Sequence, residues 1–256
     1  MQASFTHCAS LVRAADHDRY LATLFAPADK RDALFALYAF NIEIARVGDV
    51  THEPMAGEIR LQWWREALEG KRDGEAAAHP VASALREALA HHGLAPDRLI
   101  ALIDAHQSDL YDEPMAVLDE FDQYAVRTQS ALFDVAAEIL GERAESIAEL
   151  TGPAGIAYAA RNVMVEFSRH AERGPFDLPV DRLHQHALEN LAAARTAAES
   201  APSAILSALL PMATVGPQLR RLKRGGDDPV QLVPLSRLHR QWLIWRAARD
   251  PRRIFA

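Results

Sequence analysis

The apolar residues of this chain recur at spacings of three and four, and hardly any stretch alternates apolar with polar side chains. Ala, Leu, Glu and Arg, which favour helices, dominate the segments between turn signals. A period of 3.6 residues produces the apolar stripe of an α-helix, whereas a half-buried strand needs a period of two. The sequence therefore predicts an all-α protein.

Turn and capping residues divide the chain into predicted helices. These cover residues 8–24, 28–49, 56–70, 75–92, 96–112, 117–140, 144–172 with a break near Gly152-Pro153, 181–199, 202–213 and 234–249. The charge-rich segment 222–229 is predicted to be a loop, which sets apart a basic C-terminal segment of about residues 219–256. No internal repeat of fixed period is visible, so we expect a single domain over residues 1–256.

The charge and cysteine content limit the classes of partner. A net charge of -7 argues against a nucleic-acid binder, because such proteins displace counterions with a positive surface. Cys8 is the only cysteine, so an internal disulfide is impossible, and a small buried side chain is the expected role. No secretory signal and no apolar run of about 18 residues is present, so we expect a cytoplasmic protein which, if it meets a membrane, does so from one side.

Two predicted helices carry polar side chains along a face that is apolar in an ordinary core helix. In each helix the members are three or four residues apart and therefore share one face. The first stripe consists of Leu34, Tyr38, Asn41, Ala45 and Asp49, and the second of Tyr158, Asn162, Glu166 and His170. Two polar faces on predicted helices therefore require an explanation.

Several landmarks follow one another between about Asp18 and Leu183. They are RDALFALYAF at residues 31–40, RLQWW at residues 60–64, Tyr124, Gly155-x-Ala157 with Asn162, and Gly174 with Leu178-Pro179. Together they resemble the squalene/phytoene synthase family, whose members condense two prenyl diphosphates head to head on an all-α fold. The resemblance implies an isoprenoid synthase-like helical bundle whose central cavity is lined by Tyr124 and the two polar faces.

The acidic motifs of that family are largely replaced. Family members carry an Asp-x-x-x-Asp motif on each of two helices, and carboxylates four residues apart project together to hold Mg²⁺ against the substrate diphosphate. Without gaps, the motifs fall on Ala45 to Asp49 and on Glu166 to His170, so one aspartate and one glutamate remain. If the chain is an active synthase, Mg²⁺ is its cofactor and Asp49 and Glu166 are its metal ligands.

The first polar segment is more similar to a second group of the superfamily. Ala39-Phe40-Asn41-x-Glu43, followed by Glu53-Pro54 and Gln62-Trp63, resembles the phytoene synthase-like assembly factors of respiratory complex I. That resemblance implies a role in binding a protein partner, or a prenyl or lipid ligand, without turnover. The alternative is a prenyl-diphosphate transferase of the phytoene/squalene synthase type.

Two local patterns each admit two interpretations. Glu166 and His170, at i and i+4, suit an ion pair, or two ligands of a transition metal such as zinc.

The second pattern lies in the basic C-terminal segment, where ten arginines and lysines face three aspartates. In its helix we expect Leu235, Leu238, Trp242 and Trp245 to form one stripe surrounded by arginines. This is the pattern of a helix on a membrane surface or against an acidic partner, and equally of a helix docked on its own domain.

Overall fold

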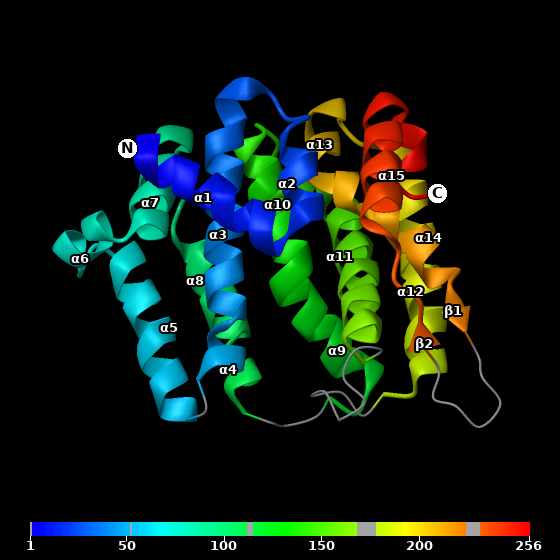
Figure 1. The fold of residues 1–256 in the computed structure, drawn as a ribbon, viewed down its shortest axis with the longest axis horizontal. Helices are drawn as coiled ribbons and strands as arrows, with labels where there is room; N and C mark the ends of the chain where they lie inside the picture. Colours follow the sequence, from blue (N-terminus) through cyan, green and yellow to red (C-terminus); the bar gives the residue numbers. More distant parts are fainter. Residues whose placement is uncertain (1, 52, 112–114, 168–177, 224–230) are drawn as a thin grey trace. The chain divides into compact units, whose positions relative to one another are not determined.

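The structure is a computed structural model that describes residues 2–51, 53–111, 115–167, 178–223 and 231–256 (Figure 1). Within these ranges the chain is helical apart from one pair of two-residue strands, which confirms the all-α prediction. None of the helices found there is long and apolar enough to cross a bilayer.

The chain divides into two compact units. Unit 1 comprises Met1–Asp112 and Glu138–Gly141, and unit 2 comprises Glu113–Ala137 and Glu142–Ala256. That residues 1–256 act as one domain stays a prediction.

Unit 1 is built around one buried helix. Its elements are α1 (Gln2–Ala15), α2 (His17–Thr23), η1 (Ala28–Lys30), α3 (Arg31–Ala45), α4 (Val47–Val50), α5 (Pro54–Leu68), α6 (Asp73–Ala78), α7 (Pro80–His92), α8 (Asp97–Ala105) and η2 (Ser108–Leu110). Helix α3 packs against α1 and α7, and its residues from Ala33 to Asn41 are all buried. Phe40 of α3 meets the buried Trp64 of α5 edge to face, with ring centroids 5.1 Å apart. The core of unit 1 therefore lies around α3.

Several predicted helices of unit 1 are interrupted. The helix predicted for residues 8–24 begins earlier and breaks at Asp16, whose carboxylate accepts a hydrogen bond from the Arg19 backbone N–H at 3.0 Å and caps α2. The helix predicted for residues 75–92 breaks at His79, which caps α7 ahead of Pro80. The helix predicted for residues 28–49 ends at Ala45 and resumes as the short α4. Each break is made by local capping or backbone geometry that a periodic pattern does not contain.

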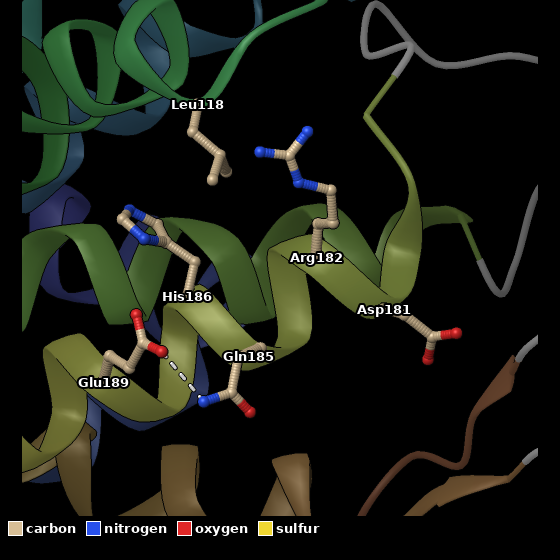
Figure 2. A pocket seen from close by; sticks show the side chains of 6 residues that line it. All are labelled: Leu118, Asp181, Arg182, Gln185, His186 and Glu189. Carbon is tan, nitrogen blue, oxygen red and sulfur yellow. Dashed lines mark hydrogen bonds between the residues drawn. The ribbon is translucent and has the colours of Figure 1, made fainter.

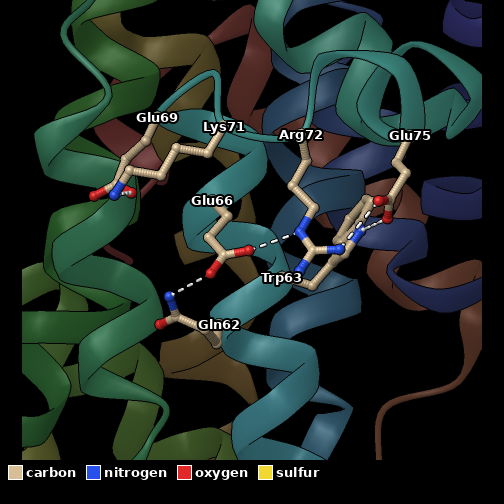
Figure 3. Close-up of polar contacts among 7 residues, drawn as sticks. All are labelled: Gln62, Trp63, Glu66, Glu69, Lys71, Arg72 and Glu75. Atoms are coloured by element: carbon tan, nitrogen blue, oxygen red, sulfur yellow. Dashed lines mark hydrogen bonds and ion pairs between the residues drawn. The ribbon is translucent and has the colours of Figure 1, made fainter.

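Surface ion pairs hold the connection between α5 and α6 (Figure 3). The Arg72 guanidinium contacts Glu66 at 2.6 Å and Glu75 at 3.0 Å, and the Trp63 indole donates a hydrogen bond to Glu75 at 2.8 Å. The indole bond, with Arg72 beside it, lowers the pKa of the Glu75 carboxyl. The chain reverses at Gly70, whose φ of 78° suits a residue without a Cβ.

Unit 2 contains the longest helix. Its elements are α9 (Leu118–Ala125), η3 (Val126–Ser130), α10 (Ala131–Ile139, whose last residues belong to unit 1), α11 (Ala144–Phe167), α12 (Val180–Ala197), η4 (Ala198–Ser200), η5 (Ser203–Ile205), α13 (Leu206–Leu209), η6 (Leu210–Thr214), α14 (Val215–Leu219), β1 (Leu222–Lys223), β2 (Gln231–Leu232), α15 (Arg237–Arg249) and η7 (Pro251–Arg253). Helix α11 packs along α12 and also against η3, α9 and α14. The segment η3 is a π-helical turn that joins α9 to α10, and such turns are frequent at functional sites.

Helix α11 runs without interruption through Pro153, so the predicted break near Gly152-Pro153 is wrong. Proline leaves one carbonyl of the preceding turn without its partner. However, Gly152 has no Cβ to clash with the proline ring, so the residue before the proline can stay helical. The helix therefore tolerates the proline.

Gly155 is where α11 comes nearest to η3. A Cβ built on Gly155 would lie 2.1 Å from Ser130 Oγ, 2.4 Å from Ser130 N and 2.6 Å from Ser130 Cα. These include backbone atoms, which cannot move aside as the end of a side chain can. Only glycine fits this contact, and it sets the rotation of α11 about its axis.

A two-stranded hairpin and one glutamine anchor the C-terminal segment. Leu222 pairs with Leu232 and Lys223 with Gln231 in antiparallel register, flanking part of the predicted loop. Gln218 donates to the Val233 carbonyl at 2.7 Å and accepts from the Leu235 N–H at 3.0 Å. Both polar groups of a buried glutamine are thereby satisfied, which fixes the start of the segment that leads into α15.

Helix α15 packs on unit 2 through a different face from the predicted one. Its buried residues are Leu243, Ile244 and Ala247, whereas Leu238, Trp242 and Trp245 are exposed. Leu235 is buried but precedes the helix. The interpretation that α15 docks on its own domain through Leu238, Trp242 and Trp245 is therefore wrong, although the helix does pack on unit 2 through its other face.

We predict that Gly155→Ala lowers the free energy of unfolding by about 3 kcal/mol or more, because the new methyl group overlaps the Ser130 backbone. Urea unfolding followed by circular dichroism measures the change. Gly74→Ala in α6 is the matched control, since nothing lies within 4 Å of its added Cβ, and it should stay within about 1 kcal/mol of the wild type. Equal effects of the two substitutions would contradict the close approach.

Candidate functional site

The first polar face lies on α3 in unit 1. Tyr38 and Asn41 are buried, and Ala45, at the last position of the helix, is half-buried. The backbone of Asp49 lies in α4, after the helix has been interrupted at Arg46, and its side chain lies outside the described part of the structure. Ala45 and Asp49 are therefore not on one continuous helix.

An arginine of α2 adds a cation to this face. Arg19 is buried, its guanidinium lies 3.0 Å from Asp16, and its Cζ atom is 5.4 Å from the centre of the Tyr38 ring. Asn41, one turn further along α3, is 6% exposed, and its Oδ1 atom has no hydrogen-bond partner in the described ranges. Unit 1 therefore buries a cation paired with Asp16, a tyrosine ring and an amide, all of which precede the Ala45 to Asp49 window in the chain.

The second polar face, on α11 in unit 2, is mostly turned outward. Tyr158 is buried, with its ring at 5.9 Å from that of Phe133, whereas Asn162 and Glu166 are exposed. His170 lies outside the described residues, so neither interpretation of Glu166 with His170 is tested.

The side chain that α11 turns inward with Tyr158 is Arg161. It is 6% exposed, and its Cζ atom lies 4.4 Å from the centre of the Tyr158 ring. Its Nε and Nη2 atoms have no hydrogen-bond partner in the part of the chain that the structure describes. A buried arginine keeps its charge, and such a group is costly unless an anion or hydrogen-bond acceptor meets it. Arg161 is thus equipped to hold an anionic group.

Neither arginine was predicted from the sequence. Arg161 follows Tyr158 at helical spacing, but the burial that marks it as inward-facing is known only from the structure. Arg19 stands three residues after the capping residue Asp16, a spacing that brings the two side chains together.

Tyr124 lies near the π-helical turn. It is half-buried on α9, and its backbone carbonyl accepts a hydrogen bond from the Thr128 hydroxyl at 2.8 Å. The π-helical geometry begins two residues after Tyr124. Tyr124 and Tyr158 both belong to unit 2, while Tyr38, Asn41, Ala45 and Asp49 belong to unit 1. A common cavity lined by all of them stays a prediction.

No metal site emerges from the described residues, since no group of three or more His, Cys, Asp or Glu side chains gathers among them. Glu43, another carboxylate of α3, lies 3.5 Å from His79. The side chain of Asp49 is outside the described part, so Asp49 and Glu166 as Mg²⁺ ligands stay a prediction.

An open pocket of about 300 Å³ lies between α9 and α12 (Figure 2). It is lined by Leu118, Asp181, Arg182, Gln185, His186 and Glu189. His186 is held by Asp122 of α9 at 2.6 Å, and Gln185 donates to Glu189 at 2.9 Å. Leu118 is the only apolar residue among the six that line the pocket.

Cys8 is fully buried in α1, as the sequence predicted. Burial raises the pKa of its thiol to about 12, and the nearby charges of Glu43 and Asp32 act in the same direction. The thiolate is the nucleophilic form of cysteine, so this residue is not a nucleophile in the folded protein.

We predict that Cys8 resists maleimide in the native state, because near pH 8 only about one thiol in ten thousand is ionised when the pKa is about 12. Mass spectrometry before and after unfolding in guanidinium chloride measures the labelling. Rapid labelling of the native chain would contradict the burial.

We also predict that Arg161→Met leaves the free energy of unfolding within about 1 kcal/mol of the wild type or raises it, because methionine removes a buried charge while keeping an extended side chain. Urea unfolding measures this, with the exposed Arg127→Met as control. A loss of several kcal/mol from Arg161→Met alone would mean that the folded chain already supplies the anion.

The fold is found in solved structures at low sequence identity. A crystal structure of a dehydrosqualene synthase in complex with a ligand is similar over 98% of this chain and 96% of that one, with a TM-score of 0.73 and 14% identity. The squalene synthase HpnC from Alicyclobacillus acidocaldarius is similar over 97% and 94%, with a TM-score of 0.66 and 16% identity. These neighbours have the isoprenoid synthase fold, as the sequence predicted.

The curated relatives of this chain are named as assembly factors and not as synthases. The rat protein named "NADH dehydrogenase (ubiquinone) complex I, assembly factor 6" is 32% identical over 183 residues, which cover 72% of this chain and 55% of the rat protein. The human protein of that name is 36% identical over 135 residues, 53% of this chain and 40% of its own. The chain thus spans about half the length of the curated relatives that it matches. The family model "Squalene/phytoene synthase" matches residues 12–190, and the chain therefore belongs to the squalene/phytoene synthase family.

Proposed function

We propose that this protein is an assembly factor for a respiratory NADH dehydrogenase and binds a protein partner without catalytic turnover. The observation that carries the proposal is the replacement at the first motif, where α3 ends at Ala45, a side chain with no metal-binding atom. The rat and human relatives named complex I assembly factor 6 support the direction of the proposal.

The chemistry of the alternative explains why this replacement matters. Ionisation of an allylic diphosphate separates several negative charges from a carbocation, so synthases stabilise the leaving group with metal ions and preorganised cations. Here the two motif windows contain Asp49 and Glu166 as their only carboxylates. Glu166 is exposed, and Arg161, five residues earlier on the same helix, is a buried cation. A buried cation favours holding an anion over holding Mg²⁺.

A ligand is compatible with this role. Buried Arg161, beside the Tyr158 ring, would suit the phosphate of a prenyl or other lipid molecule, and such a ligand would be retained without being converted. We place the protein in the cytoplasm, at the inner face of a membrane, where the assembly of a respiratory complex takes place. Nucleic acid is not proposed as a partner, given the net charge of -7.

The second candidate is a prenyl-diphosphate transferase that retains Asp49 and Glu166 as Mg²⁺ ligands. The specific observation in its favour is the similarity to a dehydrosqualene synthase over 98% of this chain. The two functions differ in their dependence on the metal.

We predict that farnesyl diphosphate gives no Mg²⁺-dependent rise in the melting temperature of the purified protein. A ligand that binds only the folded state raises stability, so a jointly bound diphosphate and metal would shift the transition when both are present. Differential scanning fluorimetry with the diphosphate, with Mg²⁺ and with both measures this. A shift of several degrees that requires both, and that Glu166→Ala abolishes, would favour the transferase.

We further predict that the double variant Asp49→Ala/Glu166→Ala supports assembly as well as the wild type does. The readout is the amount of assembled NADH dehydrogenase on native gels from cells that lack the endogenous gene. Gly155→Ala, which disturbs the fold, is the control for loss of function through instability. If cells without the gene assemble the complex normally, the proposed function is wrong.

A further inference from the structure

Helix α15 presents an apolar ridge to solvent. Leu238, Trp242 and Trp245 are 78%, 47% and 44% exposed. They follow one another at spacings of four and three residues and therefore form a single stripe of about two helical turns. The helix packs on unit 2 through Leu243, Ile244 and Ala247, so the ridge is not part of the core.

Cations lie directly against this ridge. The Arg246 guanidinium carbon is 4.6 Å from the centre of the Trp242 ring, and that of Arg249 is 3.9 Å from the Trp245 ring. The sequence of α15, RLHRQWLIWRAAR, holds four arginines and no acidic residue. The carboxylate that follows, Asp250, contacts Arg253 at 2.8 Å. The exposed face is thus both aromatic and basic.

We propose that the Leu238–Trp242–Trp245 ridge of α15 docks the protein onto a bilayer surface that contains anionic lipids. Indole rings prefer the boundary between headgroups and acyl chains, where one part of the ring is apolar and the N–H remains solvated. Guanidinium groups beside the rings would pair with lipid phosphates at the same depth. The inference rests on the membrane-side location proposed above and names the surface and the lipid charge.

The geometry favours a bilayer over an acidic protein. The exposed apolar side chains project from a single helix. Such a ridge can insert into the interfacial region of a bilayer, which needs no groove of matching shape. An acidic protein would have to supply a complementary groove and dehydrate the stacked guanidinium groups, whereas lipid headgroups solvate those groups while the rings insert. A helix of 13 residues is too short to span a bilayer, so the contact is interfacial.

The test is sedimentation of the full chain with vesicles of phosphatidylcholine, and with vesicles of phosphatidylcholine mixed with phosphatidylglycerol. The wild type is expected to bind the mixed vesicles and to bind phosphatidylcholine roughly tenfold or more weakly, because arginines near an anionic surface each add to the affinity. Binding to the mixed vesicles should weaken as salt is raised. Brominated lipid should quench tryptophan fluorescence, since Trp242 and Trp245 would reach the acyl boundary.

Two variants distinguish binding through the ridge from nonspecific binding through exposed apolar side chains. Trp242→Ala/Trp245→Ala should lower the affinity for mixed vesicles roughly tenfold or more and remove the quenching, because two large apolar side chains no longer leave water. The matched control is Met55→Ala/Ile59→Ala, which removes two side chains of α5 that are more exposed than the tryptophans. That control should bind like the wild type. Circular dichroism should show unchanged folding for both variants, because exposed side chains are replaced.

Three results would overturn the inference: no binding to mixed vesicles, equal binding to both kinds of vesicle, or equal losses in the tryptophan and control variants. If the wild type binds neither kind of vesicle, but binds a purified protein partner that the tryptophan variant does not bind, the ridge is a protein-binding surface. The proposed function and the membrane inference can fail separately. Normal assembly of the complex in cells without the gene would refute the proposed function, but it would not change the vesicle binding measured with the purified chain.

Discussion

The close approach of α11 to the π-helical turn at Gly155 decides which side chains unit 2 turns inward. A methyl group at this position would collide with the Ser130 backbone, so the two segments meet at one rotation of α11 only. With that rotation, Tyr158 and Arg161 are buried, while Asn162 and Glu166 emerge on the exposed side. The electrostatic character of the inner face of α11 therefore follows from a backbone contact two turns away.

The fold is similar to synthase structures over nearly the whole chain, but its inward-facing side chains include buried arginines. In unit 1, Arg19 lies against Tyr38 and helix α3 ends at Ala45, and in unit 2, Arg161 lies against Tyr158. Each unit thus buries one arginine against a tyrosine ring. Guanidinium groups hold anions directly and need no metal to do so. These buried cations are compatible with the proposed role of binding without turnover.

The helices and the fold could be predicted from the sequence because both depend on periodicity and on ordered landmarks. Breaks at Asp16, Arg46 and His79 could not, since they result from single caps and backbone angles. Tyr158, Asn162 and Glu166 of the second predicted stripe lie on one helix, but a period does not fix which face of that helix turns inward. Neighbouring residues on a helix differ by about 100°, and the packing of α11, including the contact of Gly155 with Ser130, makes Arg161 the inward residue in place of Asn162. In α15 the sequence predicted a stripe of Leu238 and two tryptophans, and the burial of Leu243 and Ile244 on the other side left that stripe exposed.

The most direct test of the account is release of pyrophosphate from geranylgeranyl or farnesyl diphosphate by the purified chain in the presence of Mg²⁺. Head-to-head condensation cannot proceed without this release, whatever the chain length of the product. The account predicts no release above that of a heat-denatured sample. Release that requires Mg²⁺ and disappears in Asp49→Ala would show that the remaining carboxylates still assemble a working metal site, and would contradict it.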